Sequence, residues 1–219
     1  MDDYPIKKYD FETEEDSGDE EPWMMTYGDM MTLLMTFFVL LFSMSTIDPV
    51  KLEKFSKGVG GHHGASQTHT SLSELYDAMK NIVQEENLQD VVNVESGPFG
   101  VKMNIPSELT FSTGAADLTQ QLQPFLSKLV PTMKGSIFPI AIIGHTDSDP
   151  IHTAQFPSYW ELSASRASAV ARFFISQGIK ADRLIAVGKA DTEPLVPNTS
   201  PQNKAENRRV EIQFLTESL

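Results

Sequence analysis

Residues 139–149 read Pro-Ile-Ala-Ile-Ile-Gly-His-Thr-Asp-Ser-Asp. The apolar run 139–144 is typical of a short buried strand, and the polar residues after it mark where that strand ends. The next apolar pattern predicts a helix over residues 161–177, and Gly178 suits the position that follows a helix. A buried strand that leads into a helix indicates a domain built from both kinds of element.

Further strand and helix signals lie on both sides of this unit. Gly97-Pro98 separates two short alternating runs and predicts a β-hairpin. The order of elements is β-β-α-β-α-β-β, which predicts an α+β fold: an α/β sandwich with helices on one face of a mixed sheet. The other predicted strands are 91–94, 100–105, 184–187 and 209–214, and the other predicted helices are 71–86 and 118–133.

The charge of the chain is unevenly distributed. The 219 residues carry a formal net charge of −13, and residues 1–22 form an acidic tail on a nearly balanced body. The acidic balance argues against a nucleic-acid-binding protein, which needs a basic patch for phosphates. The absence of cysteine rules out disulfides, thiolate zinc sites and a cysteine nucleophile.

An apolar segment follows the tail. Residues 30–47 contain no charged side chain, and with residues 23–29 they are long enough to cross a membrane as a helix. Trp23 suits the aromatic belt at one membrane surface. A cleaved signal peptide is the alternative, but it needs a basic N-terminal region, which this chain lacks. We therefore predict one uncleaved transmembrane helix over residues 23–47.

Asp29 is the one acidic residue in this predicted membrane helix. A carboxylate inside a membrane is costly and usually faces a partner helix or an ion path, although near a helix end it can also rest at the membrane surface. Thr32 and Thr36 follow at intervals of three and seven residues, so they share one helical face with Asp29. This polar stripe predicts a protein partner.

Residues 48–64 connect the membrane helix to the soluble part. Leu52, Phe55 and Val59 recur at helical spacing and predict a short amphipathic helix, and the glycines after it predict a flexible joint. Histidines lie in this joint without carboxylates beside them, so we interpret them as solvated rather than as metal ligands. The soluble domain is expected over residues 65–219.

The polar end of the strand 139–144 is the candidate site. Asp147 could hold an ammonium group and Arg166 could bind a carboxylate with its two-pronged guanidinium, so together they suit a zwitterionic ligand. Two alternatives stay open: the pair could simply fix the loop, or His145, Asp147, Asp149 and His152 could bind a metal in a hydrolase. The chain has no nucleophile elbow, P-loop or zinc-protease motif, which favours a protein that is not an enzyme.

Several ordered motifs in this region resemble the OmpA-like peptidoglycan-binding domain. The resemblance implies that Asp147 and Arg166 hold the diaminopimelate of the peptide stem, and that Leu162, Asn207 and Arg208 line the same groove. The motifs are Gly144-His-Thr-Asp147, Trp160-Glu-Leu-Ser-Ala-Ser-Arg-Ala167, Gly178-Ile, Asp182-Arg-Leu184, Gly188, Glu193-Pro194, Asn198 and Asn207-Arg-Arg-Val-Glu-Ile212.

The stretch 22–45, which begins Pro-Trp-Met-Met-Thr-Tyr-Gly-Asp, resembles the MotB/PomB flagellar stator subunits. The resemblance implies that Asp29 accepts and releases the coupling ion, with Thr32 and Thr36 as candidate ligands of a sodium ion. It also implies a homodimer inside a ring of MotA/PomA-type subunits that contact the rotor. The N-terminus is then cytoplasmic, the chain crosses the bacterial inner membrane once, and the C-terminal domain binds peptidoglycan in the periplasm.

The same resemblance places the helix with Leu52, Phe55 and Val59 where the family has its plug, which blocks ion leak. It implies no cofactor, and the translocated ion is H⁺ or Na⁺, with residues 30–41 closer to the sodium-driven branch. Gly28 departs from the Ala usual in the family, and the linker is short for the family. A related motor outside the flagellum, in gliding or phage defence, and a passive cell-wall anchor are the alternative functions.

Overall fold

The structure, a computed structural model, describes residues 22–43, 48–58, 70–112, 114–150, 153 and 155–216. Its internal contacts divide the chain into two units, Met1–Ser45 and Thr46–Leu219. The acidic tail and the joint between residues 59 and 69, including Val59, lie outside the described residues.

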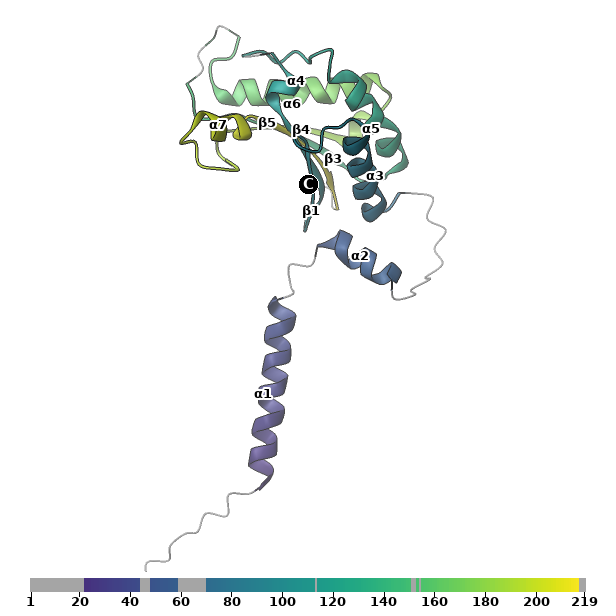
Figure 1. Ribbon diagram of the computed structural model, residues 1–219, viewed down its shortest axis with the longest axis vertical. Helices are drawn as coiled ribbons and strands as arrows, with labels where there is room; N and C mark the ends of the chain where they lie inside the picture. The colour runs from purple at the N-terminus through teal and green to yellow at the C-terminus, as the bar shows by residue number, and fades with distance from the viewer. Residues whose placement is uncertain are drawn as a thin grey trace, which may run out of the picture. The chain divides into compact units, whose positions relative to one another are not determined.

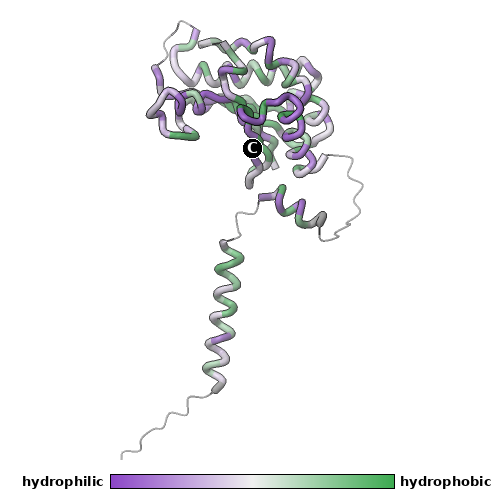
Figure 2. The backbone as a smooth tube through the Cα atoms, in the orientation of Figure 1, coloured by the Kyte–Doolittle hydropathy of each residue, from purple (hydrophilic) through white to green (hydrophobic). Residues whose placement is uncertain are grey.

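The first unit contains one helix, α1 (Pro22–Ser43). Its 22 residues at 1.5 Å each span about 33 Å, and the part Trp23–Ser43 is apolar and long enough to cross a membrane. Figure 2 shows the mostly hydrophobic helix with a hydrophilic band toward its N-terminal half. The predicted helix is therefore present up to Ser43, and residues 44–47 lie outside the described part.

The second unit is built on a five-stranded mixed sheet (Figure 1). The strand order is β1-β2-β5-β3-β4, in which β3 and β4 are parallel and the other neighbours are antiparallel. This confirms the predicted hairpin and the mixed sheet. The strands are β1 (Asn93–Gly97), β2 (Gly100–Pro106), β3 (Ile140–His145), β4 (Leu184–Ala190) and β5 (Arg209–Leu215).

Three longer helices pack on one face of this sheet (Figure 1). Ser71 caps the first of them through a reciprocal pair of bonds with Glu74, and Gly178 has the positive φ of 88° expected after the last. The long helices are α3 (Leu72–Glu85), α5 (Gln123–Gly135) and α6 (Tyr159–Ser176). The short ones are α2 (Pro49–Gly58), α4 (Ser107–Thr110), the 3₁₀ turn Ala181–Arg183 and α7 (Pro201–Asn207).

The core fills the space between the sheet and these helices. Alternate residues of β2, β5 and β3 point into it, because side chains alternate between the two faces of a strand. Helices α3, α5 and α6 supply the opposite side. Fully buried members include Val101, Met103, Ile105, Val210, Ile212, Phe214, Ile140, Ile142, Leu75, Met79, Leu126, Met133 and Phe174.

The helix α5 starts later than the predicted range 118–133. Leu118 forms an isolated β-bridge with Phe111 instead of a first helical turn. Pro124 then stands in the first turn of α5, where its missing N–H breaks no helical hydrogen bond. The prediction was wrong at this end because local apolar spacing does not reveal a pairing with an earlier segment.

A glycine at the end of β3 lets α6 approach the sheet closely. A Cβ on Gly144 would lie 2.2 Å from the carbonyl oxygen of Ser163 in α6, far inside van der Waals contact. Gly188 in β4 has a similar role, since a Cβ there would lie 2.6 Å from the backbone nitrogen of Ala164. This close packing sets Arg166, one turn of α6 further on, beside the end of β3.

The helix α2 belongs to the second unit and packs against α3 and β1. Val50 is buried in the core cluster, and the backbone N–H of Val50 donates to the carboxylate of Asp48 over 2.9 Å. Lys54 forms a 2.7 Å ion pair with Asp77 on α3. Leu52 and Phe55 face away, with 53% and 70% of their surface exposed. Two members of the predicted apolar stripe, Leu52 and Phe55, are thus present and exposed, and the third, Val59, lies outside the described residues. Val50 holds the helix in place.

Candidate functional site

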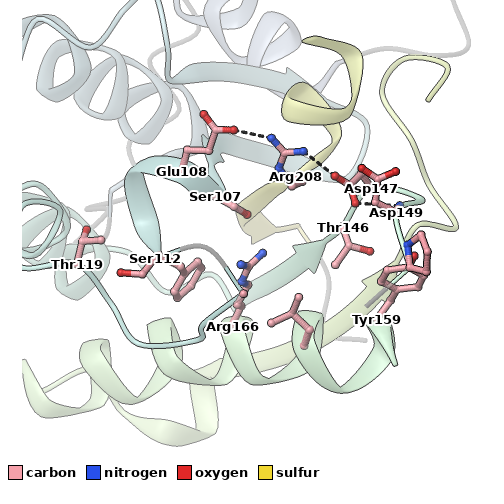
Figure 3. Close-up of a pocket in the computed structure, with 14 residues that line it drawn as sticks. Ser107, Glu108, Ser112, Thr119, Thr146, Asp147, Asp149, Tyr159, Arg166 and Arg208 are labelled. Carbon is pink, nitrogen blue, oxygen red and sulfur yellow. Dashed lines mark hydrogen bonds and ion pairs between the residues drawn. The ribbon is translucent and has the colours of Figure 1, made fainter. Parts of the chain in front are cut away.

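A groove of about 720 Å³ opens where β3 and β5 meet α4 and α6 (Figure 3). Its walls come from segments far apart in the sequence, which the sheet order brings together. The lining residues are Ser107, Glu108, Phe111, Ser112, Gly114, Thr119, Thr146, Asp147, Asp149, Pro150, Tyr159, Leu162, Arg166 and Arg208.

Asp147 is paired inside this groove. Its carboxylate accepts a 2.6 Å bond from Arg208, which also donates over 2.5 Å to Glu108. Burial alone would lower the pKa of the Arg208 guanidinium, but the bonds to Asp147 and Glu108 outweigh it and raise that pKa. Arg208 therefore bridges two carboxylates at one end of the groove.

Arg166 is a buried charge whose terminal nitrogens face the groove. Only 5% of its surface is exposed, its Nε donates to the carbonyl oxygen of Ala115 over 2.9 Å, and its guanidinium lies over the Phe111 ring. Burial and then the nearby Arg208 lower its pKa to about 10, and Asp147 opposes them only in part. Within the described residues its two terminal nitrogens have no protein hydrogen-bond partner. Such a group can bind a carboxylate through its fork.

The charges around the groove balance. Arg166 and Arg208 are positive and Asp147 and Glu108 are negative, while Asp149 is paired with Lys204 over 2.5 Å. A ligand group with one ammonium and one carboxylate would leave this balance unchanged. The groove therefore has a place for each charge of a zwitterionic ligand, one of the interpretations that the sequence leaves open.

Four of the five predicted groove residues come together: Asp147, Leu162, Arg166 and Arg208 all line the groove. The placement of Asn207 was wrong. Asn207 is fully buried, and its side-chain amide bonds to the loop before α7. The amide oxygen accepts from the N–H groups of Leu195 and Val196. The amide nitrogen donates to the carbonyl oxygen of Val196 and to the side chain of Asn198. Its role in the described structure is to hold that loop.

Three further lining residues were not predicted from the sequence: Ser107, Glu108 and Tyr159. Tyr159 precedes the recognised helix motif by one residue and could have been found from helical spacing, since it lies three residues before Leu162. Ser107 and Glu108 lie about forty residues before Asp147, and only the pairing of β2 with β5 brings them to the groove.

His145 does not join Asp147 and Asp149 in the groove. It is 1% exposed, and its Nε2 lies 3.4 Å from Oε1 of Glu211, which in turn pairs with Arg209. His152 lies outside the described residues. In the described part of the chain no cluster of three His, Asp or Glu side chains has a metal-binding arrangement. The metal-hydrolase interpretation therefore loses His145 as a ligand.

The polar stripe of α1 lies on one helical face, as its spacing predicts. The hydroxyl of Thr32 donates over 2.9 Å to the carbonyl oxygen of Asp29, and that of Thr36 donates over 2.9 Å to Leu33. Each hydroxyl oxygen keeps its lone pairs, and a sodium ion needs oxygen lone pairs for ligands.

Two family profiles match the chain. Residues 6–61 match the family described as "Membrane MotB of proton-channel complex MotA/MotB", and residues 110–208 match the "OmpA family". The first match includes α1 and α2, and the second includes Asp147, Arg166 and Arg208.

Two relatives are similar along nearly the whole chain. "Uncharacterized protein YtxE" of Bacillus subtilis is 32% identical over 233 residues, which are 94% of this chain and 95% of the relative. "Motility protein B" of Bacillus subtilis is 24% identical over 243 residues, which are 92% and 93% of the two chains. Both alignments therefore span the membrane helix and the groove-bearing domain of this chain.

Two solved structures are similar to the second unit. A "putative MotB like protein" from Desulfovibrio vulgaris matches with a TM-score of 0.62 and 32% identity, over 67% of this chain and 94% of the other. The "cell wall anchor of the T6SS" from Pseudomonas aeruginosa matches with a TM-score of 0.59 and 30% identity, over 64% of this chain and 97% of the other.

Proposed function

The chain belongs to the MotB family, and we propose that it is the stator subunit of an ion-driven rotary motor that its C-terminal domain anchors to peptidoglycan. This is the family that the motifs around Asp29 and Asp147 predict. The family consists of stator and anchor subunits and is not a known enzyme family.

The wall-binding half of the proposal rests on one observation: Arg166 is buried, and its terminal nitrogens have no hydrogen-bond partner among the described residues. A guanidinium on a residue that is only 5% exposed, with its terminal nitrogens turned into a groove, is stabilised when a carboxylate binds it. Asp147 at the other side of the groove suits an ammonium group. The diaminopimelate of a peptidoglycan stem carries both groups on one carbon, so we assign it to this groove.

The ion-coupling half of the proposal rests on Asp29. A carboxylate in a membrane helix has to be neutralised by a partner, a proton or a metal ion. Each cycle of loading and release would let a ring of MotA-type subunits step around a central pair of these chains. The membrane potential supplies about 2.3 kcal/mol per charge per 100 mV, which is several times thermal energy.

Peptidoglycan binding would set the orientation. The C-terminal domain is then periplasmic, the N-terminus is cytoplasmic, and α1 crosses the inner membrane once. The exposed Leu52 and Phe55 of α2 suit a plug that covers an apolar surface of the partner subunits. Thr32 and Thr36 remain candidate ligands of a sodium ion, and the ion itself is H⁺ or Na⁺.

The second candidate is an anchor of a non-flagellar system. The likeness of the second unit to a cell wall anchor of the T6SS favours it. A passive anchor has no use for a carboxylate in its membrane helix, so the role of Asp29 separates the two functions.

The test is therefore Asp29→Asn, which keeps the shape of the side chain but cannot gain or lose a charge. Motor rotation should stop while membrane insertion, partner assembly and wall binding stay intact. Asp29→Glu is the matched control and should keep weak rotation, because the charge survives one methylene further out. Rotation at near-normal speed in the Asn variant would contradict the ion-driven motor, and swimming speed at varied sodium and fixed pH identifies the ion.

A further inference from the structure

Ser107 and Thr146 carry hydroxyl groups that the fold buries but does not use. Ser107 is 3% exposed and Thr146 is 4% exposed, and both line the groove. Among the described residues neither hydroxyl oxygen has a hydrogen-bond partner. Buried polar atoms are nearly always bonded, and leaving one unbonded destabilises the fold. Two such atoms in one groove indicate a partner that comes from outside the chain.

The backbone holds both residues in place. Thr146 follows β3 directly, and its N–H donates over 2.9 Å to the carbonyl oxygen of Ala190. Ser107 is the first residue of α4, and its N–H donates over 2.8 Å to the carbonyl oxygen of Arg208. The two hydroxyls can therefore turn about their side-chain bonds but cannot leave the groove.

Their place in the groove points to a negatively charged ligand group. Figure 3 shows Ser107 and Thr146 between Arg166 on one side and the Arg208–Asp147 pair on the other. A carboxylate has about four lone-pair sites. One N–H from each free terminal nitrogen of Arg166 and the two hydroxyls supply four donors for one carboxylate, which is the number that a carboxylate can accept.

We propose that Ser107 and Thr146 are ligand-binding residues that donate their hydroxyls to the carboxylate held by Arg166. The inference rests on the proposed binding of peptidoglycan and adds a specificity to it. The groove requires a free side-chain carboxylate on the diaminopimelate residue. An amide at that place keeps one acceptor oxygen but replaces the other with an NH₂ group, which cannot accept from Arg166, so it leaves one terminal nitrogen of Arg166 unpaired.

The experiment uses the full chain in detergent and the stem tripeptide L-Ala-D-Glu-diaminopimelate, whose binding is measured by calorimetry. Ser107→Ala and Thr146→Val should each weaken binding about tenfold or more, since each removes one hydrogen bond to a charged group. Thr146→Ser should restore most of the affinity. The tripeptide with an amidated side-chain carboxylate should bind weakly to the unchanged protein and lose no further affinity in the variants.

Thermal unfolding without ligand separates binding from a structural role. Thr146→Val and Ser107→Ala should leave the melting temperature unchanged or raise it, because each removes a buried hydroxyl that lacks a partner. Thr110→Val is the matched control. Thr110 is also buried, but it is outside the groove and its hydroxyl donates over 3.0 Å to the carbonyl oxygen of Pro106. This control should melt lower and bind the tripeptide as before.

Three results would overturn the inference. The first is unchanged affinity in both folded variants, which would mean that the hydroxyls bind only water. The second is a parallel loss of melting temperature and affinity in both, which would assign a structural role. The third is failure of the unchanged protein to bind the tripeptide at all. This result would also reject the proposed wall binding, whereas the first two results would reject only the role of the hydroxyls.

Discussion

Arg166→Met is the substitution that tests the groove most directly. Methionine keeps a long, flexible side chain but removes the charge and all of its donors. The structure allows the effects on stability and on binding to be worked out separately, because the guanidinium makes few bonds to the protein itself.

The free energy of unfolding should change little. Burial holds the pKa of Arg166 at about 10 against an ordinary 12.5, which corresponds to about 3 kcal/mol against the charged form. Methionine removes this cost. It also loses the bond from Nε to Ala115, and a bond from a charged donor contributes about 1.5–3 kcal/mol. The contact with Phe111 is partly kept, since a thioether also packs well on an aromatic ring. The two larger effects nearly cancel.

Wall binding should be nearly lost. Removing one partner of a buried charge pair costs about 2–5 kcal/mol, which is a factor of about 30 to several thousand in affinity. The assay is sedimentation of the chain with purified peptidoglycan, together with a thermal melt of the same sample. Arg172→Met is the matched control, because Arg172 is exposed on the same helix and outside the groove. Undiminished sedimentation of a normally folded Arg166→Met protein would refute the assignment.

The remaining predictions concern the far side of the sheet and α2. Burial raises the pKa of Glu211, but His145 and Arg209 outweigh it and lower the pKa from 4.5 to about 2. The carboxylate therefore stabilises the fold above pH 4.5, and this gain of about 3 kcal/mol is lost as the pH falls toward 2. Urea unfolding at pH 6 and pH 2.5 should show a smaller loss in Glu211→Gln than in the unchanged chain, and equal losses would contradict this. Changing both Leu52 and Phe55 to Asp should let ions leak into the cell when the chain is overproduced with its partner subunit. The control Lys51→Ala should cause no leak. Normal growth and unchanged internal pH and sodium in the double variant would count against a plug.

Local patterns in the sequence were enough to predict most of the elements. The strand that ends at His145 and the helix that carries Arg166 follow from the periodicity of their apolar residues, and Ser71 and Gly178 follow from the chemistry of helix ends. These features depend on neighbours within a few residues, so the sequence shows them directly. The charge-free run before Ser43 predicts a membrane helix for the same reason.

Contacts between distant segments were decided only by the tertiary structure. The motif predicts Asn207 in the groove, but its side-chain amide makes its hydrogen bonds to the loop 195–198 instead. Residues two apart in a strand share one face, so spacing alone would place His145 and Asp147 together. The strand β3 ends at His145, however, so Asp147 leaves the strand and lines the groove, whereas His145 stays beside Glu211. Ser107 and Glu108 reach the groove only because β2 pairs with β5. Sequence spacing limits which residues can meet along one element, whereas the order of strands in the sheet determines which elements meet at all.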